Sequence, residues 1–96
     1  MSEANDHLVE QMRKNIEVAY NQIQVNLDGA SNLMKQNIET IAASMKYLSS
    51  MSGSLKDQTD TQIERTRNEM LSMVDKNKSE MLAATQKVKS NLSTGF

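Results

Sequence analysis

The sequence contains no cysteine, no proline and no tryptophan, and only three of its 96 residues are glycine. Without cysteine the chain forms no disulfide and offers no thiolate metal ligand or thiol nucleophile. The scarcity of proline and glycine removes the residues that usually mark the turns of β-rich folds. Hydrophobic residues make up 38% of the chain and only Tyr20, Tyr47 and Phe96 are aromatic, so a compact core would lack bulk. These absences favour an elongated all-α fold.

The chain also lacks a charge of one sign and a long apolar run. Eleven Lys and Arg residues stand against twelve Asp and Glu, a net charge of −1, so we expect no nucleic-acid partner. No segment approaches the roughly 18 consecutive apolar residues that span a bilayer, and the N-terminal MSEANDHLVE has no basic start or apolar stretch of a signal peptide. We therefore expect a chain that is cytoplasmic by default, with membrane-surface contact not favoured.

What the sequence does contain is an apolar stripe that keeps its phase along the first half of the chain. Its steps of three and four residues keep all members within roughly 40° of one line on a helix that turns about 100° per residue. A long amphipathic helix that packs against a partner helix is predicted. The stripe consists of Val9, Met12, Ile16, Tyr20, Ile23, Leu27, Ala30, Met34, Ile38, Ile41, Met45 and Leu48.

Four serines around Gly53, in the segment Ser49-Ser50-Met51-Ser52-Gly53-Ser54, mark the one strong break. Serine side chains compete for backbone hydrogen bonds, and glycine permits turn conformations. We therefore predict one helical domain over residues 1–96, with a helix over about 5–48, a turn over about 49–54 and a helix over about 55–92. Ser54 is the expected N-cap of the second helix. The second helix has its own stripe of Ile63, Met70, Val74, Met81, Val88 and Leu92.

Two polar features of the stripes leave alternatives open. Asp28-Gly29 would give three helices if it formed a turn, but the stripe crosses it without losing phase, so we favour one continuous helix. Arg67 and Asn77 share the second stripe, where a polar residue can fix the register and oligomeric state of packed helices. Equally, a loosely packed second helix would leave both side chains in water.

No residue pattern indicates a catalytic, cofactor-binding or metal site, and we expect none of the three. His7 is the only histidine, and no cysteine or second histidine exists to join it in a metal or catalytic centre. Acids and bases spaced four residues apart predict solvent-exposed pairs along each helix. These pairs are Glu10 with Lys14, Lys35 with Glu39, Arg65 with Glu69, and Lys76 with Glu80.

The expected fold is a long antiparallel, coiled-coil-like helical hairpin that completes a helical bundle by oligomerisation. We expect a non-enzymatic assembly or scaffold subunit whose partner is itself, another helical protein, or both. The first alternative is an amphipathic-helix binder of lipid surfaces, although such helices usually carry Lys or Arg on their polar face. The second is a small helical secretion-system substrate or chaperone. In length and central turn the chain resembles the hairpins of type VII secretion, but Met51-Ser52-Gly53 replaces their Trp-x-Gly, and without the tryptophan the specific part of the resemblance is lost.

Overall fold

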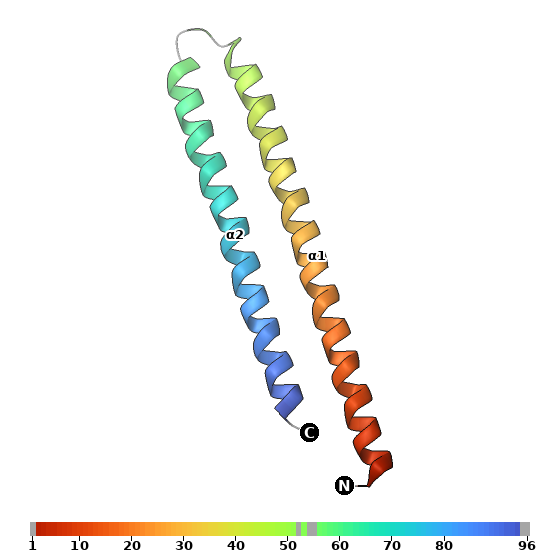
Figure 1. The fold of residues 1–96 in the computed structure, drawn as a ribbon. Helices are drawn as coiled ribbons and strands as arrows, with labels where there is room; N and C mark the ends of the chain where they lie inside the picture. The colour runs from red at the N-terminus through yellow and green to blue at the C-terminus, as the bar shows by residue number, and fades with distance from the viewer. Residues whose placement is uncertain (1, 52, 54–55, 95–96) are drawn as a thin grey trace.

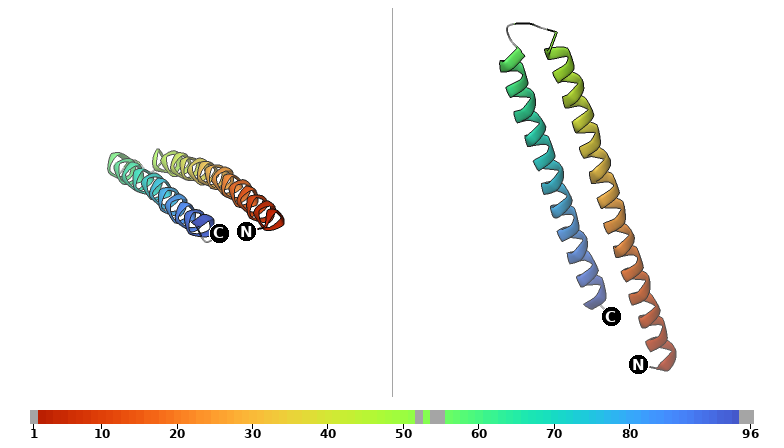
Figure 2. Two further views of the ribbon diagram at one scale, coloured as in Figure 1. Left: turned by 60° about the horizontal axis from the view of Figure 1, so that its bottom comes forward. Right: turned by 45° about the horizontal axis from the view of Figure 1, so that its top comes forward.

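The computed structural model describes residues 2–51, 53 and 56–94 and contains two long helices in this part of the chain. Helix α1 runs over Glu3–Ser49 and helix α2 over Lys56–Thr94. They lie side by side in opposite directions, with the connection at one end and both termini at the other (Figure 1). The two views of Figure 2 show the same pairing along the whole of α2. The predicted all-α antiparallel hairpin is therefore confirmed.

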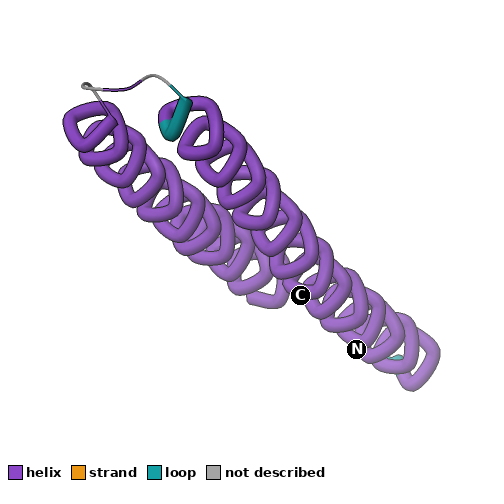
Figure 3. Tube along the Cα trace, turned by 90° about the horizontal axis from the view of Figure 1, so that it is seen from above, coloured by secondary structure: helices purple, strands orange, loops and turns teal. Residues whose placement is uncertain are grey.

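The molecule is much more extended than a globular chain of this length. Its principal extents are 78 × 16 × 7 Å and its radius of gyration is 22.0 Å, against about 12 Å for a compact domain of this size. A single rod of about 90 residues would instead be roughly 135 Å long at 1.5 Å per residue. Seen from above in Figure 3, α1 and α2 form one layer, and no further element of the described chain packs across either face.

Local signals account for the ends of α1. The Ser2 hydroxyl caps the start by accepting a hydrogen bond of 3.2 Å from the backbone N–H of Asn5. At the other end, the N–H of Ser50 still reaches the Lys46 carbonyl at 2.9 Å, and Met51 closes a tighter turn onto Leu48 at 3.1 Å. Helix α1 thus ends where the serine cluster begins.

The connection contains a residue in the left-handed region, Gly53, with φ of 79°. Glycine adopts this conformation without the steric strain that a Cβ would bring. The predicted cap, Ser54, lies outside the described residues. Helix α1 runs without interruption through Gly29, so the chain has one helix, and not two, before the connection.

Candidate interaction surface

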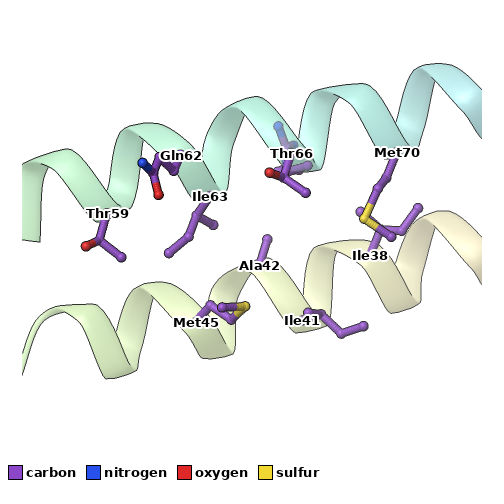
Figure 4. A pocket seen from close by; sticks show the side chains of 10 residues that line it. Ile38, Ile41, Ala42, Met45, Thr59, Gln62, Ile63, Thr66 and Met70 are labelled. Carbon is purple, nitrogen blue, oxygen red and sulfur yellow. The ribbon is translucent and has the colours of Figure 1, made fainter.

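The seam between α1 and α2 is narrow. Among the described residues the buried hydrophobic side chains are Ile38, Ala42, Ile63 and Val74, each 7–8% exposed, and none is fully enclosed. Ala42 and Ile63 point toward each other between the helices (Figure 4). A two-helix hairpin offers each side chain only one facing helix, so its core is a line and not a volume.

Small polar side chains complete this seam. Ser31 and Ser49 are 4% and 5% exposed, although sequence patterning predicted neither as an interface residue. Small residues at contact points let two helix axes approach closely. The seam therefore lies beside the predicted apolar stripe of α1, between that stripe and the charged side of the helix.

The predicted stripe residues divide into three groups in the hairpin. Ile38, Ile63 and Val74 are buried between the helices. Val9, Ile16, Tyr20 and Leu27 are half-buried, as is Arg67. The remaining predicted residues, including Asn77, are exposed: Met12, Ile23, Ala30, Met34, Ile41, Met45, Leu48, Met70, Met81, Val88 and Leu92. Whether these exposed residues contact a second helical protein stays a prediction.

Ion pairs line one edge of the seam from the connection to the open end. Moving away from the connection, they join Lys46 with Glu64, Glu39 with Arg67, Lys35 with Asp75, Asp28 with Lys78, and Glu17 with Lys89. The charges follow one another in complementary order on the two helices, so the antiparallel register matches each base with an acid. Each pair is partly exposed, which makes its individual contribution small.

These contacts correct part of the sequence-based pairing. Lys35 and Glu39 were expected to pair with each other along α1. Instead Lys35 lies 2.5 Å from Asp75, and Glu39 binds Arg67. Lys76 and Glu80 do pair along α2, at 4.0 Å.

At the open end, Tyr20 collects several of these contacts. The Lys89 ammonium lies 4.5 Å from the centre of the Tyr20 ring and 2.7 Å from the Glu17 carboxylate. Gln24 donates a hydrogen bond of 3.3 Å to the Tyr20 hydroxyl. A cation above an aromatic face is attracted by the electron-rich ring, so this cluster holds the last turns of α2 against α1.

The hydrogen bonds of these pairs shift several pKa values. The hydrogen bond from Lys46 lowers the pKa of the Glu64 carboxyl, and the nearby Arg67 adds to the effect. Glu39 raises the pKa of Arg67 in the same way. Near the connection, Lys56 donates a 2.7 Å hydrogen bond to Asp60 and lowers its pKa, with help from Ser49. Glu64, Arg67 and Asp60 are thus all held in their charged forms at neutral pH.

The opposite edge of the seam carries hydrophobic grooves. Near the connection, a groove of about 230 Å³ is lined by Ile38, Ile41 and Met45 of α1 together with Ile63 and Met70 of α2, as Figure 4 shows. A second groove of about 350 Å³ continues from it toward Met34 and Met73. A third, of about 120 Å³, lies near the open end.

We call the surface over these grooves the apolar face. It is formed by side chains of both helices that are exposed or half-buried in the single hairpin. Its members are Ile16, Ile23, Met34, Ile41, Met45, Met70, Met73, Val88 and Leu92. Isolated exposed hydrophobic residues are ordinary, but a continuous strip of them along one edge indicates an interaction site.

Methionine dominates this surface. All seven methionines in the described part of the chain are at least 40% exposed, and Met34, Met45, Met70 and Met73 line the two larger grooves. The thioether chain is flexible and polarizable, so it adapts to the shape of whatever covers it. The methionines here fill no core of the hairpin, which favours the interpretation that they belong to an intermolecular contact.

The apolar face has no charge on its α1 side. On a helix that turns about 100° per residue, every Asp, Glu, Lys and Arg of α1 falls in one sector about 100° wide, turned away from Ile41. The residues beyond the face on α1 are uncharged, such as Asn26, Asn37 and Ser44. A partner can therefore cover α1 without burying an ionised group.

No chemical centre accompanies this surface within the described residues. His7 is exposed in the first turns of α1, and no three His, Asp or Glu side chains in residues 2–51, 53 and 56–94 are grouped closely enough to hold a metal ion. Neither described helix is apolar over the length needed to cross a membrane. Comparison with protein-family models, curated proteins and solved structures finds no match to this chain.

Proposed function

We propose that this chain is a non-enzymatic assembly subunit, a coiled-coil-like hairpin that associates through its apolar face with itself or with another helical protein. The observation that carries the proposal is the unpartnered apolar face, which runs along both helices beside a narrow seam. Ile41 and Met45 are 55% and 50% exposed in the single hairpin. Association with further helices would bury these side chains and complete a helical bundle.

The exposed area supports this proposal. The hairpin exposes 7200 Å², whereas a compact monomer of its 10.8 kDa mass exposes about 5,500 Å². The excess is about twice the roughly 800 Å² that each partner buries in an interface of standard size. The single hairpin therefore has enough unburied surface to form a stable contact along one face.

A lipid surface is the competing occupant, because long amphipathic helices also cover bilayers. Helices of that kind place Lys and Arg beside their apolar side, where the cations meet anionic headgroups. The α1 side of the apolar face has uncharged Asn and Ser residues in that position, such as Asn37 and Ser44. This chemistry fits packing against another helix better than it fits an anionic membrane.

Light scattering of the purified chain at micromolar concentration, with circular dichroism alongside, tests the proposal. We expect an oligomer, and we expect Ile23→Asp and Ile41→Asp to dissociate it. Both side chains are exposed in the single hairpin, so a carboxylate there remains hydrated in the monomer and is buried only in the assembly. Glu10→Gln, at an exposed position on the charged sector of α1, is the control and should change neither mass nor helicity.

The results separate the alternatives. A monomeric chain whose mass and stability are unaffected by both aspartate variants contradicts the proposal. A monomer that becomes more helical only with vesicles of phosphatidylcholine and phosphatidylserine, and loses that response in Ile41→Asp, favours the lipid-surface function instead.

A further inference from the structure

A row of charges borders the apolar face on its α2 side. It consists of Arg65, Glu69, Lys76, Glu80 and Lys87, all of them exposed. A shallow depression lined by Arg65, Glu69 and Met73 joins this row to the apolar face, since Met73 also lines the 350 Å³ groove. A partner that covers the apolar face would therefore have its edge next to these charges.

The order of the first four charges, from Arg65 to Glu80, is informative. Their signs alternate from base to acid, and their spacings are four, seven and four residues, which read the same in either direction. Reversing these four charges keeps the spacing and inverts every sign. A second α2 that runs antiparallel would therefore place Arg65 opposite Glu80 and Glu69 opposite Lys76, twice over by symmetry. In this alignment Lys87 lies opposite the uncharged Gln58.

A parallel second copy has the opposite consequence. In register, it would set Arg65 against Arg65 and Glu80 against Glu80, and like charges that face each other across packed helices are destabilising. The uncharged α1 side of the apolar face offers this row no counter-charge. The row therefore distinguishes between orientations of a second copy, and it favours the antiparallel one.

The level of the two-fold axis is indicated by the apolar face. The charges also match about residue 78, where Glu69 would face Lys87 and Lys76 would face Glu80. Only the midpoint between Ser72 and Met73 falls within the 350 Å³ groove, which spans Met70 to Asn77 on α2. Met73 is 61% exposed there. A two-fold axis at this point would bring the Met73 of each copy to the groove of the other.

We propose that the partner of the apolar face is a second copy of this chain, packed face to face and antiparallel, with α2 beside α2 and a two-fold axis near Met73. This inference rests on the proposed function, because it assumes that the apolar face associates. On α1, the same axis places Ile41 across from Ala30 of the second copy, a large side chain against a small one. The product is a four-helix bundle whose orientation is fixed by charge.

Charge reversal tests the orientation. Arg65→Glu and Glu80→Lys each place like charges opposite one another at two symmetric positions. Each should raise the dimer dissociation constant about five- to thirty-fold, with the effect shrinking at high salt. The double variant Arg65→Glu/Glu80→Lys should restore the dissociation constant to near that of the original chain. Lys14→Glu, at an exposed position on the charged sector of α1, is the control and should leave it unchanged.

The double variant also excludes an effect within one helix. Glu80 contacts Lys76 along α2, and Glu80→Lys replaces that contact by a repulsion that Arg65→Glu does not repair. Helicity lost through this pair would therefore remain lost in the double variant. If the double variant associates normally while any helicity lost in Glu80→Lys stays lost, the contact of Arg65 with Glu80 lies between two copies.

Cross-linking gives an independent readout, because the chain has no cysteine of its own. In the antiparallel arrangement Met73→Cys should form a disulfide between two copies. Gln62→Cys alone should form no disulfide, whereas a mixture of Gln62→Cys and Ala83→Cys should form one. The proposed axis places residue 62 of one copy opposite residue 83 of the other. Val25→Cys, on the side of α1 turned away from the apolar face, is the control that should remain unlinked.

The outcomes separate the two proposals. If the chain associates and Ile41→Asp dissociates it, but the charge reversals have no effect and Gln62→Cys links to itself, the antiparallel dimer is wrong and the assembly function stands. If the chain is monomeric at micromolar concentration, the second copy is wrong as the partner. If the monomer also tolerates Ile41→Asp without change, the assembly function falls with it.

Discussion

Arg67 of α2 binds the carboxylate of Glu39 on α1 through two nitrogens on one edge of its guanidinium group. Its Nη2 lies 2.6 Å from Oε1, and its Nε donates a hydrogen bond of 2.8 Å to Oε2. Only an Arg can make this fork-shaped contact, because a Lys ammonium is a single point charge. Arg67 thus joins the two helices at a half-buried position of the seam, and its proposed role in setting their register has a defined partner.

A double-mutant cycle measures this role. Glu39→Gln and Arg67→Gln should each lower the thermal midpoint by a few degrees, and the double variant should cost less than the two single changes together. The reason is that either change already removes the paired charge. Arg67→Lys should recover only part of the loss, since it cannot bind both carboxylate oxygens. Strictly additive single effects would show that the contact contributes nothing specific.

The low pKa of Glu64 predicts a stability that depends on pH. A carboxyl whose folded pKa lies below its ordinary value of 4.5 contributes stability that is present above that value and is lost as the pH falls through the folded pKa. The Lys46 ion pair should therefore weaken below about pH 4.5. We expect the thermal midpoint to fall in this range, and less steeply in Glu64→Gln. Glu10→Gln, the control, should keep the full dependence; identical slopes in all three chains would contradict the prediction.

Which parts of the hairpin could be predicted from sequence depends on the kind of signal each residue carries. The helices and their break follow from periodic apolar residues and clustered serines, because helical geometry converts spacing directly into position. The continuity of α1 through Gly29 follows from the same phase argument. Apolar periodicity, however, identifies the centre of the apolar surface and not the line along which the second helix touches it.

For that reason the apolar stripes identify Ile38, Ile63 and Val74 of the seam but not its small residues. Its buried members on α1 include Ser31, Ala42 and Ser49, whose small side chains carry little hydrophobic signal, and Lys35 and Lys46 flank them. The signal that was present is the complementary order of charges on the two helices. Read in antiparallel order, it matches Lys46 with Glu64 and Glu39 with Arg67, which pairing along one helix does not reveal.

The two described glycines that differ in backbone conformation should respond to alanine in opposite directions. Gly29 lies inside α1, and a Cβ added there meets nothing within 4 Å, so Gly29→Ala should stabilise the hairpin by about 0.5–1 kcal/mol. Gly53 has a positive φ, so Gly53→Ala should destabilise it by about 1 kcal/mol. Urea unfolding followed by circular dichroism measures both. A destabilised Gly29→Ala chain would indicate that another molecule approaches the backbone at that point.

Asn77 provides the last prediction, because the hairpin leaves it exposed on the rim of the 350 Å³ groove. Asn77→Leu should hardly change the thermal midpoint at low protein concentration, where the side chain faces water. At high concentration the midpoint should rise, since association would bury a leucine in place of an amide that must lose its hydration. The measurement is the thermal midpoint of both chains over a range of concentrations, with light scattering of each sample.

Three further outcomes bear on the role of Asn77. If the leucine variant forms a broader range of masses as it becomes more stable, the amide specifies one alignment at a cost in stability. A single unchanged oligomer with a raised midpoint means that Asn77 only weakens the contact and specifies nothing. A midpoint that shifts equally at every concentration would place Asn77 in a contact within one hairpin, contrary to its exposed position.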